Sequence, residues 1–273
     1  MASLKGKTLF ITGASRGIGE AIGLRAAHDG ANVVIAAKTT EPHAKLPGTI
    51  HTAARAMEAT GGAALPVVMD IRDEAQIARA VDAAVTRFGG IDILVNNASA
   101  ISLTGTAETP LKRFDLMMGI NVRGTFACTQ ACLPHLKRAV NPHVLTIAPP
   151  PNLKPRWFKD HVAYSIAKYG MSLCVLGHAE EFRSLGIAVN ALWPRTVIAT
   201  AALQMIPGID PRGGRTPAIM ADAAHAILTR EARSNTGNFF IDDEVLAAEG
   251  VSDLTPYAVD QTRPLIPDLF LEA

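Results

Sequence analysis

The stretch Thr12-Gly13-Ala14-Ser15-Arg16-Gly17-Ile18-Gly19 decides the fold of this chain. An apolar run, residues 8–12, leads into it, a helical pattern follows to about residue 28, and a second apolar run covers residues 32–37. Strand, glycine-rich turn, helix and strand make a parallel βαβ unit, in which glycines let the backbone approach a pyrophosphate at the helix N-terminus. The Gly-x-x-x-Gly-x-Gly spacing differs from the standard dinucleotide fingerprint, so the prediction of dinucleotide binding depends on the strand–turn–helix context.

Runs of strand length alternate with helical patterns through the rest of the chain. Further strands are expected at residues 64–69, 91–95, 144–148, 187–192 and 237–241. This alternation predicts an α/β fold, a single Rossmann-type doubly wound parallel sheet of about seven strands that is flanked by helices on both faces. Because no repeat or linker interrupts the sequence, residues 1–273 are expected to form one domain. Residues 250–273 are expected to be a packed C-terminal extension, since residues 265–271 are too apolar to stay free in water.

The composition excludes several classes of function. The net charge of +1 gives no electrostatic case for nucleic acid, and no apolar run is long enough to insert into a membrane as a helix. The N-terminus leads into a strand without a signal peptide. The three cysteines are not accompanied by other residues at the spacing of metal ligands; they are Cys128, Cys132 and Cys174. We therefore expect a cytoplasmic protein with buried thiols and no metal site.

Tyr164 and Lys168 stand four residues apart in a helical pattern, which places them on the same helix face. An ammonium about 4 Å from a phenolate contributes roughly 4 kcal/mol at an effective dielectric near 20. That energy is enough to lower a phenol pKa from its usual value of about 10 to about 7. The pair can therefore form a proton donor or acceptor that works near neutral pH.

Other motifs stand where parallel strands are expected to end. Asp70 follows the third strand, Asn96-Asn97-Ala98 follows the fourth and Pro194 follows the sixth, while Asn121 stands inside a helical region. Ligands of open α/β sheets bind at this edge. In this order the motifs resemble those of the short-chain dehydrogenase/reductase family, and the resemblance covers about residues 5–245.

Five longer stretches resemble the hydroxysteroid-dehydrogenase-like branch of that family. They are residues 35–39, 96–103, 163–171, 190–194 and 264–271. Larger members of the branch carry a sterol-carrier-like domain after this region, and this sequence is expected to be without one.

The resemblance implies catalytic roles for three residues. Tyr164 would be the general acid in carbonyl reduction and the base in alcohol oxidation, and Lys168 would lower its pKa and hold the nicotinamide ribose. Asn121 would anchor a water that relays protons from Lys168 to solvent, or would simply bridge helices. The remaining cofactor-binding residues that the resemblance implies are Gly13, Ser15, Arg16, Gly17, Ile18, Gly19, Lys38, Asp70, Ile71, Asn96, Ala98, Pro194, Ile198 and Thr200.

One position departs from the family pattern. Members usually carry a serine about thirteen residues before the tyrosine, where it binds the carbonyl oxygen. The corresponding residue here is Pro151, or Pro149 when the position is counted from the end of the fifth strand. A proline side chain cannot donate a hydrogen bond, and losing one such donor costs roughly 3–4 kcal/mol of transition-state stabilisation. The candidates for replacing the serine are Ser99, Ser102 and Asn152.

The end of the second strand favours NADP(H) over NAD(H). A carboxylate there would bind the adenosine ribose and repel a 2′-phosphate. This chain has Ala37 followed by Lys38, and Arg16 of the glycine turn could reach the same place. Two cations without an acid favour a 2′-phosphate. His43 and Lys45, in the following loop, could add to the phosphate site or could be solvated.

Two hypotheses from different classes follow. The first is an oxidoreductase that transfers a hydride between NADP(H) and a lipophilic alcohol or carbonyl substrate. Trp157 would line its apolar substrate mouth, and His161 would face the cleft or be structural. The second is an NADP(H)-binding sensor or scaffold with little or no turnover, which the missing serine favours. In either case the resemblance implies a homodimer or homotetramer that pairs the long fourth and fifth helices.

Overall fold

The computed structural model describes residues 2–42, 46–203, 206 and 208–272 of the chain. In these residues seven parallel strands form one sheet in the order β3-β2-β1-β4-β5-β6-β7. The strands are β1 (Thr8–Thr12), β2 (Asn32–Ala37), β3 (Ala63–Val68), β4 (Ile93–Asn96), β5 (His143–Ile147), β6 (Ala188–Trp193) and β7 (Phe239–Ile241). The predicted doubly wound parallel sheet is confirmed.

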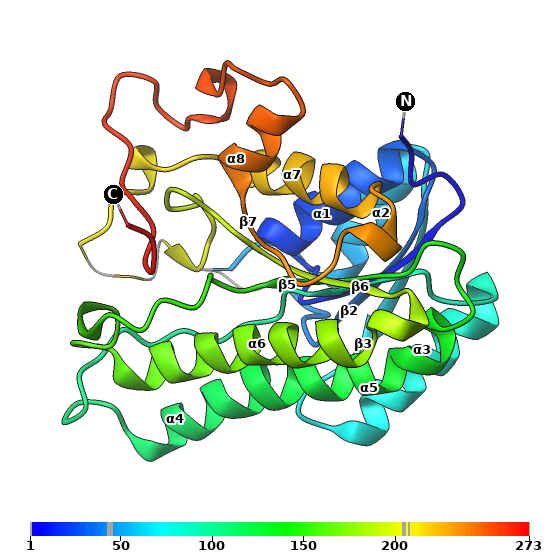
Figure 1. Ribbon diagram of the computed structural model, residues 1–273, viewed down its shortest axis with the longest axis horizontal. Coiled ribbons are helices and arrows are strands. Elements are labelled where there is room, and N and C mark those ends of the chain that lie inside the picture. The colour runs from blue at the N-terminus through cyan, green and yellow to red at the C-terminus, as the bar shows by residue number, and fades with distance from the viewer. Residues whose placement is uncertain (1, 43–45, 204–205, 207, 273) are drawn as a thin grey trace.

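Helices cover both faces of this sheet (Figure 1). One face carries α1 (Gly17–His28), α2 (Ile50–Ala59), α7 (Ala218–Leu228) and α8 (Asp242–Ala248). The other face carries α3 (Glu74–Phe88), α4 (Leu111–Met117), α5 (Gly124–Leu136) and α6 (Val162–Glu181). A π-helical turn, Met118–Arg123, joins α4 to α5. The sheet is therefore buried on both sides, which explains why its strands appear in the sequence as continuous apolar runs.

The first strand shows how the two faces of the core are built. Leu9 and Ile11 pack into the cluster beneath α1 and α7, whereas Phe10, between them, packs into the cluster beneath α3 and α5. All three side chains are fully buried, because successive residues of a strand point to opposite faces.

The direction of winding reverses between β1 and β4. From β1 the chain proceeds to β2 and β3 on one side, and from β4 it proceeds to β5, β6 and β7 on the other. The connections that leave the carboxyl ends of β1 and β4 therefore diverge, and they leave a crevice in which ligands of such sheets bind.

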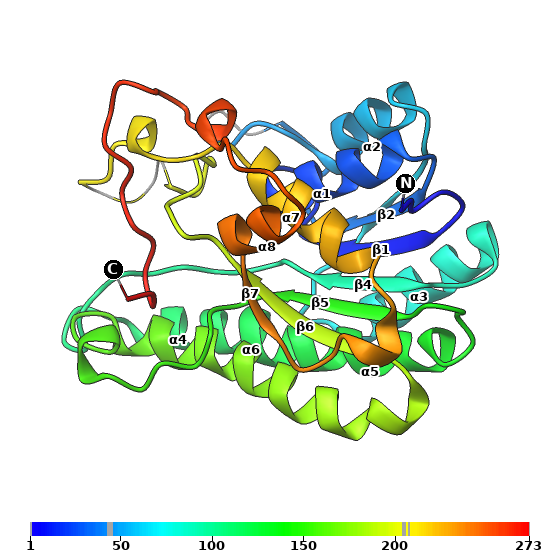
Figure 2. The ribbon, with the colours of Figure 1, turned by 45° about the horizontal axis from the view of Figure 1, so that its top comes forward.

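After α8 the chain returns along the carboxyl edge of the sheet. It forms isolated backbone bridges from Ala258 to Arg215 and from Pro267 to Thr196, and it ends beside the N-terminal end of α6 (Figures 1 and 2). Among the described helices, none is long and apolar enough to cross a membrane.

Candidate functional site

A cavity of about 900 Å³ occupies the crevice at the carboxyl ends of β1, β2, β3 and β4. Many of the residues predicted from the sequence line it: Gly13, Ser15, Arg16, Gly17, Ile18, Lys38, Asp70, Ile71, Ala98, Ser99, Ser102 and Thr200. Other predicted site residues lie outside its lining: Gly19, Asn96, Asn121, Asn152, Trp157, Tyr164, Lys168, Pro194 and Ile198. The cavity also has lining residues that the sequence reasoning did not identify, among them Leu103, Arg113 and Ile120.

Asn97 holds the glycine turn against the end of β4. Its side-chain Nδ2 donates hydrogen bonds to the carbonyl oxygens of Thr12 (2.9 Å) and Gly13 (3.2 Å). The backbone N–H groups of Asn97 and Ala98 donate to Thr12 Oγ1, each at 3.0 Å. Gly13 has φ +69°, and a Cβ there would lie 2.9 Å from the Cα of Ala98. Because Gly13 and Gly17 have no side chains, the backbone of the turn is accessible from the cavity, as binding of a pyrophosphate requires.

Gly19 lies outside the cavity lining and supports the turn through its close approach to Asn97. A Cβ on Gly19 would lie 2.4 Å from Asn97 Nδ2. Glycine is needed here so that α1 can approach the asparagine that braces the turn, and Gly19 itself does not line the cavity.

The structure corrects the assignment of Asn96. Asn96 is 1% exposed and its Nδ2 donates to Thr129 Oγ1 on α5 at 3.1 Å, so it does not line the cavity as expected. The residue that does so is its neighbour Asn97. Consecutive strand residues point to opposite sides, and this alternation is the sequence signal that could have separated the two asparagines.

The two cations predicted to favour a 2′-phosphate, Lys38 after β2 and Arg16 in the glycine turn after β1, differ in availability. Lys38 is exposed at the cavity. Arg16 donates hydrogen bonds to the carbonyl oxygens of Leu46, Pro47 and Gly48, so its guanidinium holds the loop that follows β2. His43 and Lys45, predicted near this place, lie outside the described residues.

Asp70 remains ionised beside the cavity. Arg72 donates from Nε to Asp70 Oδ1 at 3.0 Å, and this hydrogen bond is the main reason that the pKa of Asp70 falls to about 2. Arg72 therefore adds a cation, missed in the sequence reasoning, beside the expected adenine site.

Tyr164 and Lys168 lie on α6 and are 6% and 2% exposed. Lys168 Nζ donates to the carbonyl oxygen of Ile147, the last residue of β5, at 2.6 Å, and it lies 4.8 Å from the ring centre of Trp193. Burial lowers the pKa of Lys168 to about 7, an effect that the charge of Asp268 opposes.

The expectation that Lys168 lowers the pKa of Tyr164 stays a prediction. Burial raises the pKa of Tyr164 well above its ordinary value, and the negative charge of Asp268 raises it further. Taking a phenolate out of water is unfavourable, and this desolvation is the larger of the two causes. Asp268 is a further site residue that the sequence reasoning missed. Burial raises its pKa to about 7, although the Leu269 N–H and Lys168 lower it.

Asn121 lies in the π-helical turn and is fully buried. Its Oδ1 accepts a hydrogen bond from the N–H of Ala100 at 2.7 Å, and its Nδ2 donates to the carbonyl oxygen of Ala100 at 3.1 Å. The amide therefore fixes the loop after β4 that carries Ser99 and Ser102. Such π-turns are frequent at functional sites.

The candidates for the missing serine fall into two groups. Ser99 and Ser102 line the cavity, and Ser102 Oγ lies 3.3 Å from Thr104 Oγ1. Asn152 is turned away from the cavity, since its Nδ2 donates to Glu272 Oε1 at 2.9 Å and its carbonyl accepts from the Tyr169 hydroxyl at 2.7 Å.

Residues near the C-terminus cover Tyr164. Phe270 lies with its ring centre 6.2 Å from that of Tyr164 and 6.1 Å from that of Trp157. His161 borders the same place at 6.2 Å from Phe270, and its Nδ1 lies 3.0 Å from Ser165 Oγ. Trp157, expected at a substrate mouth, is therefore in contact with the chain's own tail.

Comparison with known proteins gives consistent results. The family described as short chain dehydrogenase matches residues 7–207. Hydroxysteroid dehydrogenase-like protein 2 of Danio rerio is 61% identical over 270 residues, which are 98% of this chain and 65% of that relative. This chain therefore spans about two thirds of the length of such relatives.

Two solved structures have the same fold throughout. A protein from Xanthomonas campestris is 64% identical, with a TM-score of 0.98 over 99% of this chain and 100% of that one. A short chain dehydrogenase from Mycobacterium thermoresistibile is 53% identical, with a TM-score of 0.94 over 99% of this chain and 97% of that one.

Proposed function

The chain belongs to the short-chain dehydrogenase family, in its hydroxysteroid-dehydrogenase-like branch, and from this premise we propose that it transfers a hydride between NADP(H) and a lipophilic alcohol or carbonyl compound. One observation carries the proposal. A cavity with a bare glycine turn lies at the switch point of the sheet, and Lys168 is bonded to the end of β5, the strand next to β4.

The cavity residues fit a dinucleotide. The turn at Gly13 and the N-terminus of α1 would hold the pyrophosphate, and Asp70 with Ile71 would flank the adenine. Lys38 would bind the 2′-phosphate. Beyond the cavity lining, Pro194 and Ile198, together with Thr200 of the lining, would border the carboxamide, and Lys168 would hold the ribose. When bound, the nicotinamide supplies or accepts the hydride.

Tyr164 would donate the proton. Its raised pKa keeps the phenol protonated at neutral pH, and a protonated phenol is a proton donor, not a base. The protonated phenol is the form that carbonyl reduction requires. Asn121, which holds the loop beside the site, is proposed to anchor the water that returns the proton through Lys168.

The decisive experiment compares NADPH binding with NADPH oxidation against hydrophobic aldehydes and ketones. Tyr164→Phe should abolish turnover and leave NADPH affinity within about twofold of the unmodified protein, because the hydroxyl acts mainly in the transition state. Turnover that survives this substitution would contradict the assigned role of Tyr164.

The NADP(H) preference has its own test. Lys38→Asp should weaken NADPH binding at least about tenfold, since it removes a charge-assisted hydrogen bond and adds a repulsion. Lys5→Asp makes the same change of charge at the opposite, amino edge of the sheet and should leave the affinity unchanged. Equal affinities of the unmodified protein for NADH and NADPH would refute the preference.

A second candidate is an NADP(H)-binding sensor or scaffold with little turnover. The observation that favours it is the pair Pro149 and Pro151 at the place of the usual serine, together with the burial of Tyr164. Tight NADPH binding without any turnover that depends on Tyr164 would support this candidate.

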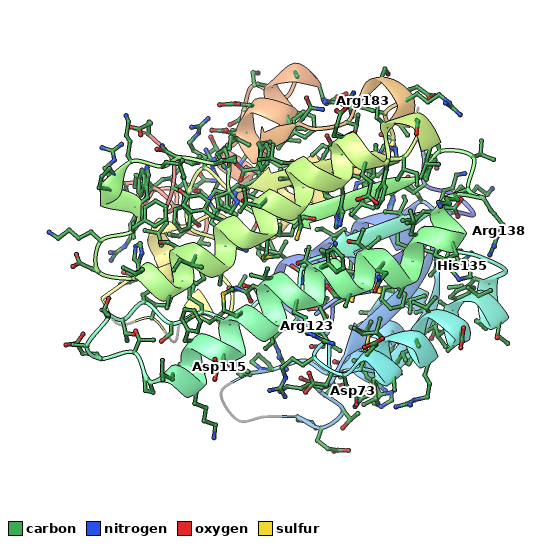
Figure 3. The ribbon with its side chains drawn as sticks, turned by 60° about the horizontal axis from the view of Figure 1, so that its bottom comes forward. Asp73, Asp115, Arg123, His135, Arg138 and Arg183 are labelled. Atoms are coloured by element: carbon green, nitrogen blue, oxygen red, sulfur yellow. The ribbon has the colours of Figure 1, made fainter. Side chains whose placement is uncertain are left out.

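We also propose a homo-oligomer. Figure 3 shows α5 and α6 side by side on one surface, and Phe126 on α5 lies 5.5 Å from His178 on α6 between ring centres. Exposed apolar side chains follow one face of this pair: Phe126, Val162, Ile166, Leu173 and Leu176. Such a contiguous apolar surface is typical of an interface between copies.

A further inference from the structure

Phe270 is buried in a pocket made of aromatic side chains. It has no exposed surface. The centres of five rings lie within 5.1 to 6.2 Å of its own ring centre: Tyr169 at 5.1 Å, Trp193 at 5.9 Å, Trp157 at 6.1 Å, and Tyr164 and His161 at 6.2 Å. These distances are those of favourable aromatic contacts.

The backbone at Phe270 is strained. Its φ is +74°, in the left-handed region that side chains other than glycine rarely adopt. The next residues lie at the surface, where Leu271 is half-buried and Glu272 is exposed. The chain therefore takes an unfavourable conformation in order to insert one phenyl ring.

The segment that carries Phe270, residues 264–272, is attached to the two loops that border the site. The carbonyl oxygen of Ile266 accepts a hydrogen bond from the N–H of Val197 at 3.0 Å, and the N–H of Ile266 donates to the carbonyl oxygen of Gly213 at 2.8 Å. Trp193 Nε1 donates to the carbonyl oxygen of Leu269 at 2.9 Å.

Beyond the buried Phe270, the last described residue of the segment is held by groups at the surface. Glu272 pairs with Asn152, Lys154 and Arg156 in the loop before α6. Ion pairs between such exposed groups contribute little to stability, so this end of the segment is weakly attached.

A substrate carbonyl must come within about 3 Å of the Tyr164 oxygen to receive its proton. Tyr164 is 6% exposed, and Phe270 lies against its ring. Two described residues other than glycine have a positive φ, Phe270 in this segment and Asp160 just before α6, and Phe270 is the one whose ring lies against Tyr164.

We propose that the pocket filled by Phe270 is the substrate subsite, that it takes an aryl or similarly broad apolar group of a carbonyl compound, and that segment 264–272 is a gate which this group displaces. The inference rests on the proposed function and names the substrate class of that same site. In the closed state, Phe270 occupies the place in the subsite that the apolar group of the substrate would take. The apparent affinity for substrate is then reduced by the fraction of molecules in which the gate is open.

The two tryptophans of the chain, Trp157 and Trp193, both contact Phe270, so their fluorescence reports on this pocket alone. Three variants test the gate. Phe270→Ala empties the pocket, and Glu272→Lys repels the segment from Lys154 and Arg156. Glu249→Lys is the matched control, because Glu249 is an exposed carboxylate paired with Arg230 on another part of the surface.

The readouts are acrylamide quenching of tryptophan and calorimetric binding of 2-acetylnaphthalene without cofactor. Phe270→Ala and Glu272→Lys should increase quenching and tighten 2-acetylnaphthalene binding at least about fivefold. NADPH affinity should stay within about twofold, and the control should match the unmodified protein. If Phe270→Ala fails to fold, Glu272→Lys decides alone.

Unchanged quenching and unchanged ketone affinity in Glu272→Lys would overturn the gate. That result is distinct from failure of the proposed function. Tyr164-dependent NADPH oxidation with no response to either variant refutes the gate only. Ketone binding that tightens in both variants while no carbonyl is reduced supports the gate and refutes the oxidoreductase.

Discussion

Gly19→Ala is the substitution whose effect the structure predicts most directly. The added methyl would lie 2.4 Å from Asn97 Nδ2, well inside ordinary van der Waals contact. Helix α1 is packed on the sheet, so the side chain of Asn97 has to move. Its two hydrogen bonds to the carbonyl oxygens of Thr12 and Gly13 are then lost.

The magnitude follows from these two bonds. Each contributes about 0.5–1.5 kcal/mol net, so the turn loses roughly 1–3 kcal/mol. A displaced turn must be restored when a pyrophosphate binds, so this energy is subtracted from cofactor affinity. The dissociation constant for NADPH should rise between about 5-fold and 150-fold.

The assay is calorimetric titration with NADPH, beside urea unfolding of the same samples. Gly90→Ala is the control, because no atom lies within 4 Å of a Cβ at Gly90. A double-mutant cycle sharpens the test. In an Asn97→Ala background the clash with the amide is gone and only a 3.1 Å contact with the Cα of Ala14 remains, so Gly19→Ala should cost much less. NADPH affinity of Gly19→Ala within twofold of the unmodified protein, or full additivity with Asn97→Ala, would refute the reasoning.

Four further outcomes are expected. Leu173→Lys should dissociate the oligomer in light scattering, whereas Val140→Lys, at a more exposed residue (92% against 63%) that follows the end of α5, should leave its mass unchanged. Lys168 has a native pKa of about 7 against about 10 in the unfolded chain. The unfolding free energy should therefore rise by roughly 4 kcal/mol from pH 7 to 10, and Lys168→Met should flatten that rise. Asp268, with a native pKa raised to about 7, contributes stability that is lost from pH 4 to 7, a loss that Asp268→Asn should remove in urea unfolding. Pro151→Ser should raise the rate of carbonyl reduction at least about tenfold if the site lacks a donor, and an unchanged rate would mean that another group already binds the carbonyl.

The strands could be predicted from the sequence because each lies between two helical layers. A strand buried on both faces needs apolar residues at nearly every position, and such runs are visible without any knowledge of contacts. The prediction for residues 144–148 is shifted by one from β5, His143–Ile147, because His143 is polar and yet fully buried. The order of the strands in the sheet was not predicted and is known from the structure.

Some of the residues that line the cavity were predicted from the sequence, and others were missed. Residues of the glycine turn and those just after β2 and β3 lie at the cavity because strand ends share one edge of the sheet. Arg16 is correctly placed there, but its guanidinium is used by the carbonyl oxygens of Leu46, Pro47 and Gly48. A side chain's partners come from segments distant along the chain, and no local pattern indicates them.

The linear pattern of apolar runs, glycines and strand-end polar residues was sufficient for the parallel sheet, the switch-point crevice and the helix face shared by Tyr164 and Lys168, since periodicity and turn geometry are local properties. Only the tertiary structure shows that burial and Asp268 raise the pKa of Tyr164, and that Phe270 covers it from more than a hundred residues away along the chain. Desolvation and ring packing depend on which surfaces meet, and that is decided when the chain closes on itself.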